Sequence, residues 1–183
     1  MPRYVAFLRA INVGGKSVIK MVELAKIFES AGLKNVQTYI QSGNVIFESA
    51  AKSEDVLRRK IEQGIKKKKG YDTVACLRTE AEVRAVAKCD PFRGHPLRAK
   101  GKFYVAFLAD QPLPERVRAL EALNSDIELY KVKGREVYVV FTDDKRAKTK
   151  FSGNAVEKIL GVKATGRNWN VVGEIAGLLV EGK

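Results

Sequence analysis

The chain has 183 residues, of which 45% are hydrophobic and 30% are charged. This composition is typical of a folded protein with a core and argues against a disordered or fibrous chain. Its apolar runs stay well short of the roughly 20 residues that a membrane helix needs, and the N-terminus lacks a signal-peptide pattern. We therefore expect a cytoplasmic protein without membrane contact, built as one ordinary domain or two small ones.

The formal net charge is +13, and both halves of the chain contribute to it. Residues 1–90 contain 17 Lys/Arg and 10 Asp/Glu, and residues 91–183 contain 17 and 11. Such an excess favours binding of nucleic acid, anionic small molecules or an acidic protein, through long-range attraction and counterion release. A well-solvated surface without any partner is the alternative interpretation.

Few side chains are suited to metal or nucleophilic chemistry. Cys76 and Cys89 form no Cys-x-x-Cys pair, so reduced thiols are the simplest interpretation. His95 is the only histidine and lies in a segment rich in proline and glycine, without the neighbours that a metal site or a His-activated nucleophile needs. We expect no metal site and no cofactor, and the sequence identifies no catalytic residue.

An internal repeat is the most informative feature of the chain. Tyr4-Val5-Ala6-Phe7-Leu8 recurs as Tyr104-Val105-Ala106-Phe107-Leu108. In both copies a helical pattern follows, and then two strand patterns joined by a turn that contains glycine. The same order of elements after both copies indicates a duplication.

Hydrophobic spacing and capping signals predict the elements of the first copy. In chain order they are a strand at 3–8, a helix from Met21 to Gly32, strands at 36–40 and 45–48, a helix from Ser53 to Lys69, a strand at 73–77 and a helix after the Thr79–Glu82 capping box. The first copy is therefore β-α-β-β-α-β with an appended helix.

The second copy follows a segment, residues 91–101, that contains Pro91, Gly94 and Pro96 and is expected to be a linker. The predicted elements are a strand at 103–108, a helix at 114–123 and strands at 127–132 and 136–141. Ser152 and Thr165 are predicted to cap two closing helices. The second copy would then end in a helix in place of a fourth strand.

These elements predict an α+β fold of two tandem ferredoxin-like repeats, of the β-α-β-β-α-β type, with antiparallel sheets and C-terminal helices. Residues 1–90 would form the first repeat, 91–101 the linker and 102–183 the second repeat. The way in which the repeats pack, and the oligomeric state, are left open.

Chain direction in the first repeat places three loops at one end of the sheet, at 12–17, 41–44 and 66–71. A glycine-rich turn before a helix can offer free N–H groups to an anion. Alternatively, the glycines serve only the turns and the lysines only the end of a helix. The candidate anion- or ligand-binding residues in these loops are Asn12, Gly14, Gly15, Lys16, Ser17, Gln41, Ser42, Asn44, Lys68 and Lys69.

The segment Ala10-Ile11-Asn12-Val13-Gly14-Gly15-Lys16-Ser17 is one residue short of the phosphate-loop pattern of nucleotide hydrolases. Its first glycine is replaced by Ala10. A short hairpin also follows the first helix, and this connection requires antiparallel pairing, whereas those enzymes use a parallel sheet. The segment is therefore a weak match to a nucleotide-binding loop.

Three blocks carry a resemblance to a known family. They are Arg9-Ala10-Ile11-Asn12-Val13-Gly14-Gly15, Thr38-Tyr39-Ile40-Gln41-Ser42-Gly43-Asn44-Val45 and Ala164-Thr165-Gly166-Arg167-Asn168-Trp169-Asn170. In this order they resemble the bacterial domain of unknown function family 1697, which usually has glycine at the position of Ala10. The resemblance implies a duplicated α+β fold in a bacterial cytosolic protein, and it transfers no catalytic residue.

In the third block, Arg167, Asn168 and Asn170 are expected in the first turn of a helix, where they could hold a phosphate or tie the helix to the preceding loop. Trp169 begins an apolar stripe and is expected to be a core anchor.

Three functions stay open. The first is a binding module for nucleic acid or another polyanion. The second is a small-molecule site, in a binding protein or an enzyme, for a phosphorylated or carboxylated metabolite at the three-loop end. In the second, Lys16 would attract the anion while Asn12, Gln41 and Asn44 orient it. The third is an adaptor that binds an acidic protein.

Overall fold

The computed structural model describes residues 1–15, 17–144 and 148–181. These residues form two compact units, Met1–Val83 and Arg84–Lys183. Each unit contains a four-stranded antiparallel sheet, and seven helices are present in the described part of the chain. The fold is therefore mixed α+β, as the sequence predicts.

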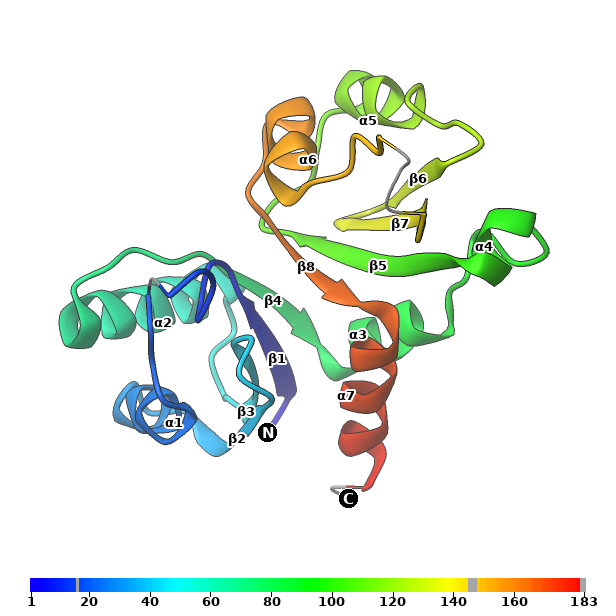
Figure 1. Cartoon of the computed structure of the whole chain (residues 1–183). Helices are drawn as coiled ribbons and strands as arrows, with labels where there is room; N and C mark the ends of the chain where they lie inside the picture. Colours follow the sequence, from blue (N-terminus) through cyan, green and yellow to red (C-terminus); the bar gives the residue numbers. More distant parts are fainter. Residues whose placement is uncertain (16, 145–147, 182–183) are drawn as a thin grey trace. The chain divides into compact units, whose positions relative to one another are not determined.

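Unit 1 (Figure 1) consists of β1 (Arg3–Leu8), α1 (Met21–Ser30), β2 (Lys34–Tyr39), β3 (Asn44–Glu48), α2 (Glu54–Lys69), β4 (Ala75–Thr79) and the start of α3 (Glu80–Lys88). Its strands are ordered β2-β3-β1-β4, and every neighbouring pair is antiparallel. This pairing excludes the parallel sheet of a phosphate-loop hydrolase.

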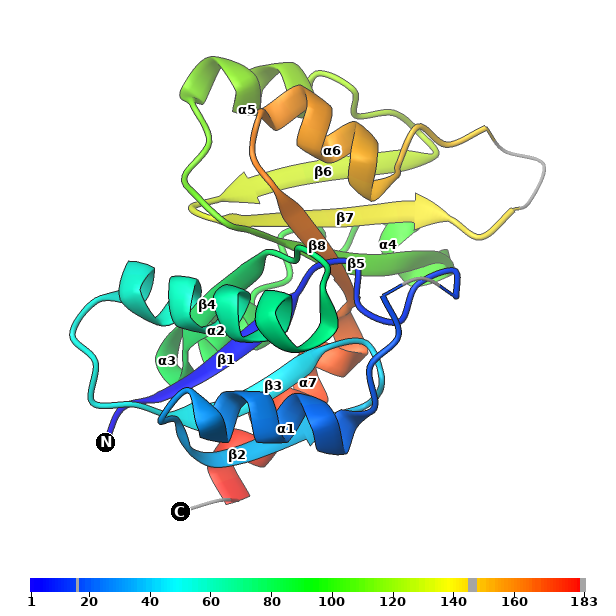
Figure 2. The same ribbon diagram turned by 90° about the vertical axis from the view of Figure 1, so that its left-hand side faces the viewer.

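Helices α1 and α2 lie side by side on the same face of the sheet of unit 1 (Figure 2). The apolar stripe Leu57, Ile61 and Ile65 of α2 is fully buried against the sheet, as the spacing of these residues predicts. Ser53 begins α2 by accepting a hydrogen bond from the Val56 N–H at 3.4 Å. Gly70 ends it in the left-handed conformation, which favours glycine.

Unit 2 consists of the end of α3, α4 (Pro96–Lys100), β5 (Gly101–Leu108), α5 (Pro114–Glu121), β6 (Glu128–Lys133), β7 (Glu136–Thr142), α6 (Gly153–Leu160), β8 (Ala164–Asn168) and α7 (Trp169–Glu181). Its strand order is β6-β7-β5-β8, again fully antiparallel. The segment expected to be a linker, residues 91–101, contains the short helix α4.

The sequence prediction was wrong for the end of the second copy. Thr165 lies in β8, which pairs with β5, and does not cap a helix. The helix begins at Trp169, after Asn168, whose Oδ1 accepts a hydrogen bond from the Asn170 N–H at 2.9 Å. Pairing with the buried strand β5 overrides the weak strand propensity of a segment that contains Gly166. The prediction for Ser152 is confirmed. Its Oγ accepts a hydrogen bond from the Ala155 N–H, so Ser152 is the N-cap of α6.

Two buried arginines occupy matching positions in the two sheets. Arg78 lies opposite Val5 in unit 1, and Arg167 lies opposite Val105 in unit 2. Their exposed fractions are 0% and 7%. Burial of a guanidinium is costly unless the group is hydrogen-bonded. The same costly residue at the same position of both sheets is therefore a further sign of the internal repeat.

Candidate functional site

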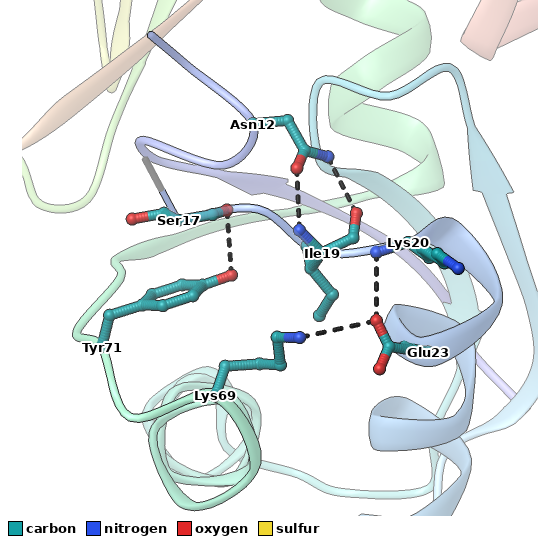
Figure 3. Close-up of polar contacts among 7 residues, drawn as sticks. All are labelled: Asn12, Ser17, Ile19, Lys20, Glu23, Lys69 and Tyr71. Carbon is teal, nitrogen blue, oxygen red and sulfur yellow. Dashed lines mark hydrogen bonds and ion pairs between the residues drawn. The ribbon is translucent and has the colours of Figure 1, made fainter. Parts of the chain in front are cut away.

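The three loops predicted to converge in unit 1 do meet; Figure 3 draws the contact between the first and the third. The Asn12 Nδ2 group donates to the Gln41 carbonyl at 2.9 Å, which joins the first loop to the second. The Tyr71 hydroxyl donates to the Ser17 carbonyl at 3.1 Å, which joins the third loop to the first. These two bonds confirm the predicted convergence. They do not test whether a ligand binds there.

The amide of Asn12 is bonded to main-chain groups at both ends. Its Oδ1 accepts from the Ile19 N–H at 2.8 Å, and its Nδ2 donates to the Ile19 carbonyl at 3.0 Å as well as to Gln41. The buried Asn44 similarly donates to the Tyr39 carbonyl and to the Ser42 Oγ. Asn12 therefore joins the first loop to the second, whereas Asn44 ties the hairpin to itself.

The remaining loop residues are more open to solvent. Gly14, Gly15 and the side chain of Gln41 are exposed, while Ser17 and Ser42 are half-buried. Gly14 and Gly15 have φ angles of 61° and 72°, in the left-handed region that favours glycine. The predicted ligand-binding residue Lys16 lies outside the described residues.

The N-terminus of α1 carries its own carboxylate. Glu23 accepts a hydrogen bond from the Lys20 N–H at 3.3 Å, and its Oε2 lies 3.5 Å from the Lys69 Nζ (Figure 3). The hydrogen bond from the Lys20 backbone, together with the charge of Lys69, lowers the pKa of Glu23 below its usual value. Glu23 therefore occupies one N–H group at this helix end, that of Lys20.

A basic groove runs along the seam between α1 and α2. It comprises a hollow of about 310 Å³ and a second of about 470 Å³, which share Ile27, Ser30 and Lys68. We call this feature the lysine groove, defined by the side chains that surround the two hollows, namely Lys26, Lys60, Lys67, Lys68 and Lys69. Lys68 and Lys69 thus lie in the last turn of α2, where the sequence predicts the helix to end, and their side chains surround the hollows between the two helices.

The helix-interior glycine Gly64 brings the two helices close together. A Cβ atom at this position would lie 3.0 Å from the Ile27 Cγ2, which is tighter than ordinary van der Waals contact. The absence of a side chain here lets the groove form with lysines of both helices along it.

Most of the groove lysines are available for an incoming anion. Lys26, Lys60, Lys67 and Lys68 are exposed, and none of them pairs with a carboxylate among the described residues. Lys69 is engaged by Glu23, and the neighbouring Lys66 pairs with Asp72 at 2.6 Å, outside the groove. The arrangement can therefore attract negative charge.

Sequence reasoning missed Lys26, Lys60 and Lys67. One signal was present, since Gly64 in the middle of a helical pattern marks close packing against another element. Lys60 and Lys67 flank it and are seven residues apart, which places them on one helix face two turns apart.

The third block of the sequence lies in unit 2. Arg167 is buried and donates from its Nη1 to the Thr165 Oγ1 at 2.7 Å and to the Gly166 carbonyl at 2.8 Å. Asn168 caps α7, and the exposed Asn170 lies at the edge of a hollow of about 400 Å³ beside Trp169. The observed contacts of Arg167 and Asn168 are therefore structural.

Trp169 packs inside unit 2. Its ring stacks on Phe103 with the centroids 5.0 Å apart, and the Arg98 guanidinium lies 5.1 Å from the Trp169 ring centroid and 4.4 Å from that of Phe103. The predicted role as a packing anchor is confirmed by this stack.

Two classes of site receive no support from the described residues. No group of three histidine, cysteine or carboxylate side chains in this part of the chain is placed to hold a metal ion. Likewise, none of the described helices combines the length and the apolar character needed to cross a bilayer.

Comparisons with known proteins agree with the resemblance seen in the sequence. The chain is similar to a solved structure, the conserved bacterial protein SP0830 from Streptococcus pneumoniae, with 24% identity and a TM-score of 0.78 over 98% of this chain and 99% of that one. This likeness shows a shared fold. A comparison with curated proteins gives no match. Residues 1–138 match the model of a family described as "Protein of unknown function (DUF1697)", and the chain therefore belongs to this family.

Proposed function

We propose that unit 1 binds a polyanion, with nucleic acid as the favoured class, and that the lysine groove is the contact surface. The observation that carries the proposal is a set of four exposed lysines around one seam, Lys26, Lys60, Lys67 and Lys68, which have no carboxylate partner in the described part of the chain. Like charges placed together repel one another, and an anion that bridges them relieves this repulsion and releases counterions.

The charge is concentrated on one pair of helices. Helix α2 carries seven basic and three acidic residues, and α1 carries one basic and two acidic, so the pair has a net charge of +3. The corresponding pair in unit 2, α5 and α6, carries three basic and three acidic residues and is neutral. Since a merely solvated surface gives no reason for this difference between the repeats, it supports a role for the groove in unit 1.

The sheet of unit 1 offers little platform for base stacking. On the face away from α1 and α2, Val5, Phe7, Ile46 and Cys76 are at most 2% exposed, and the half-buried Tyr39 lies on the same face in the edge strand β2. Sheet-based RNA-binding modules need exposed aromatic rings on that face. We therefore expect contacts to phosphates, with little sequence preference and a strong dependence on salt.

The test is a fluorescence-anisotropy titration with labelled double-stranded DNA, double-stranded RNA and single-stranded DNA at low salt. The triple variant Lys60→Gln, Lys67→Gln, Lys68→Gln should lose about tenfold or more in affinity. It neutralises fewer phosphates than the wild type, so its binding releases fewer counterions from the nucleic acid. The matched control changes Lys100, Lys150 and Lys158 to Gln, three exposed lysines of unit 2.

The control variant should lose much less affinity than the groove variant. Equal losses would show that net charge alone drives binding and would reject the groove. Absence of binding to all three nucleic acids, with saturable binding of inorganic phosphate or ATP, would move the proposal to the small-molecule class. Binding of an acidic protein alone would favour the adaptor.

For the fold, we also propose a more specific assignment than the α+β class. We propose that both units are ferredoxin-like repeats, with residues 1–90 and 102–183 as their extents and 91–101 between them. The strand orders β2-β3-β1-β4 and β6-β7-β5-β8 support this, as does the shared β-α-β-β-α-β succession.

A further inference from the structure

Glu23 has a special position in the lysine groove. Among the described residues that surround the two hollows, it is the only carboxylate, and it lies at the smaller hollow together with Lys26, Lys68 and Lys69. Its side chain is 51% exposed, so an incoming ligand can reach it.

The carboxylate of Glu23 draws Lys69 toward α1. The Lys69 Nζ lies 3.5 Å from the Glu23 Oε2, and the Lys69 side chain is 25% exposed. Figure 3 shows the two side chains pointing toward each other from their two helices. Lys69 is thus neutralised, whereas the nearby Lys26 and Lys68 are not.

We propose that Glu23 is an internal competitor for the ligand of the lysine groove: its carboxylate occupies the Lys69 ammonium group, and a bound phosphate takes its place. This inference rests on the proposed polyanion binding. Exposed ion pairs are weak, so a phosphate, which carries more charge and more acceptor oxygens than a carboxylate, can displace Glu23 from Lys69. The pair therefore lowers the affinity for weakly charged anions and keeps Lys69 in place for strong ones.

The two roles of Glu23 can be separated by substitution. Glutamine at this position still accepts the hydrogen bond from the Lys20 N–H and keeps the capping box, but it carries no charge. Glu23→Gln therefore removes the competition while it preserves the helix end. The matched control is Glu29→Gln, an exposed glutamate on the same helix that does not surround the groove.

The experiment is a double-mutant cycle of Glu23→Gln and Lys69→Gln, read as affinity for double-stranded RNA at several salt concentrations. Glu23→Gln should tighten binding several-fold and steepen the salt dependence by about one counterion, and Glu29→Gln should do clearly less. Lys69→Gln alone should weaken binding less than the same change does in the Glu23→Gln background, because in the wild type the phosphate must first displace Glu23 from Lys69. In the Glu23→Gln background the same change should remove the gain.

Two results would overturn the inference. One is a Glu23→Gln affinity equal to that of the wild type or of Glu29→Gln, and the other is a gain that persists in the double variant. If the groove triple variant still loses binding in either case, the proposed function stands and only the competition fails. If the wild type binds no polyanion, both fail together.

Discussion

Asn12 donates its side-chain amide to the main-chain carbonyl of Gln41, 29 residues further along the chain, at a distance of 2.9 Å. The same amide exchanges two hydrogen bonds with the backbone of Ile19. One side chain thus fixes the loop after β1 against both the hairpin and the segment that leads into α1. It is placed to position α1, which forms one wall of the lysine groove.

We predict that Asn12→Asp destabilises the protein by about 2–3 kcal/mol, because two amide donors are lost and the carboxylate faces two carbonyl oxygens. Aspartate keeps the size of asparagine and tolerates the φ angle of 53°. Gln41→Ala should change stability by about 0.5 kcal/mol or less, since only its backbone takes part in the contact. Urea denaturation measures both. Equal effects would show that Asn12 is not the link between the loops.

Gly43 and Gly70 allow a matched test of two left-handed glycines. Gly43 has a φ of 76°, and a Cβ there would lie 3.0 Å from the Leu8 Cβ, whereas Gly70 has a φ of 79° and open space around it. Gly70→Ala should cost about 1–2 kcal/mol for the backbone conformation alone. Gly43→Ala should cost about 1–3 kcal/mol more, because it also overpacks the core. Thermal unfolding of both variants compares them, and an equal loss would contradict the packing argument.

The backbone conformation at Ile40 is strained for isoleucine and suits asparagine better. It is β-branched, has a φ of 49° and is 47% exposed. Asparagine adopts this conformation with less strain, so Ile40→Asn should raise stability by about 1 kcal/mol. An increase in the urea midpoint without a change in slope would confirm this. A decrease would mean that the isoleucine side chain contributes packing that outweighs the strain.

Two tyrosines of unit 2 should resist ionisation. Tyr130 and Tyr138 are 2% and 3% exposed. Burial raises the pKa of both, and the charge of Glu128 adds to this for Tyr130, as the hydrogen bond to Cys89 does for Tyr138. Because their folded pKa is raised, their contribution to stability is complete below about pH 10 and is lost as the pH rises through the folded pKa.

An alkaline titration followed by absorbance of tyrosinate tests this. Of the six tyrosines, Tyr130 and Tyr138 should ionise only as the far-ultraviolet circular dichroism is lost. Tyr130→Phe and Tyr138→Phe should each reduce the absorbance change of that step. Reversible ionisation of all six before unfolding would contradict the burial argument.

Much of the fold could be predicted from the sequence, because the patterns that specify it are local. The exact repeat of Tyr4–Leu8 and the stripe on α2 predicted the matching strands and the buried helix face. Strand β8 could not be predicted in this way. A strand that contains Gly166 is stabilised by its pairing with β5, and this contact joins residues about 60 apart in the chain.

Only part of the candidate site could be predicted from the sequence. Chain direction predicted that the loops around Asn12, Gln41 and Tyr71 would meet, since this follows from topology. The lysine groove depends on how α1 and α2 pack, and that is set by Gly64 against Ile27. Whether Lys26 lies beside Lys68 is a property of this packing, so no pattern within one helix could show it.

The salt dependence of polyanion binding tests the central claim most directly. For each lysine that contacts a phosphate, the slope of the logarithm of the affinity against the logarithm of the salt concentration changes by about 0.9 for duplex DNA. Replacing Lys60, Lys67 and Lys68 with glutamine should therefore reduce the slope by about two to three units, while the unit 2 control keeps the wild-type slope. A groove variant whose slope equals that of the wild type would show that phosphates bind elsewhere.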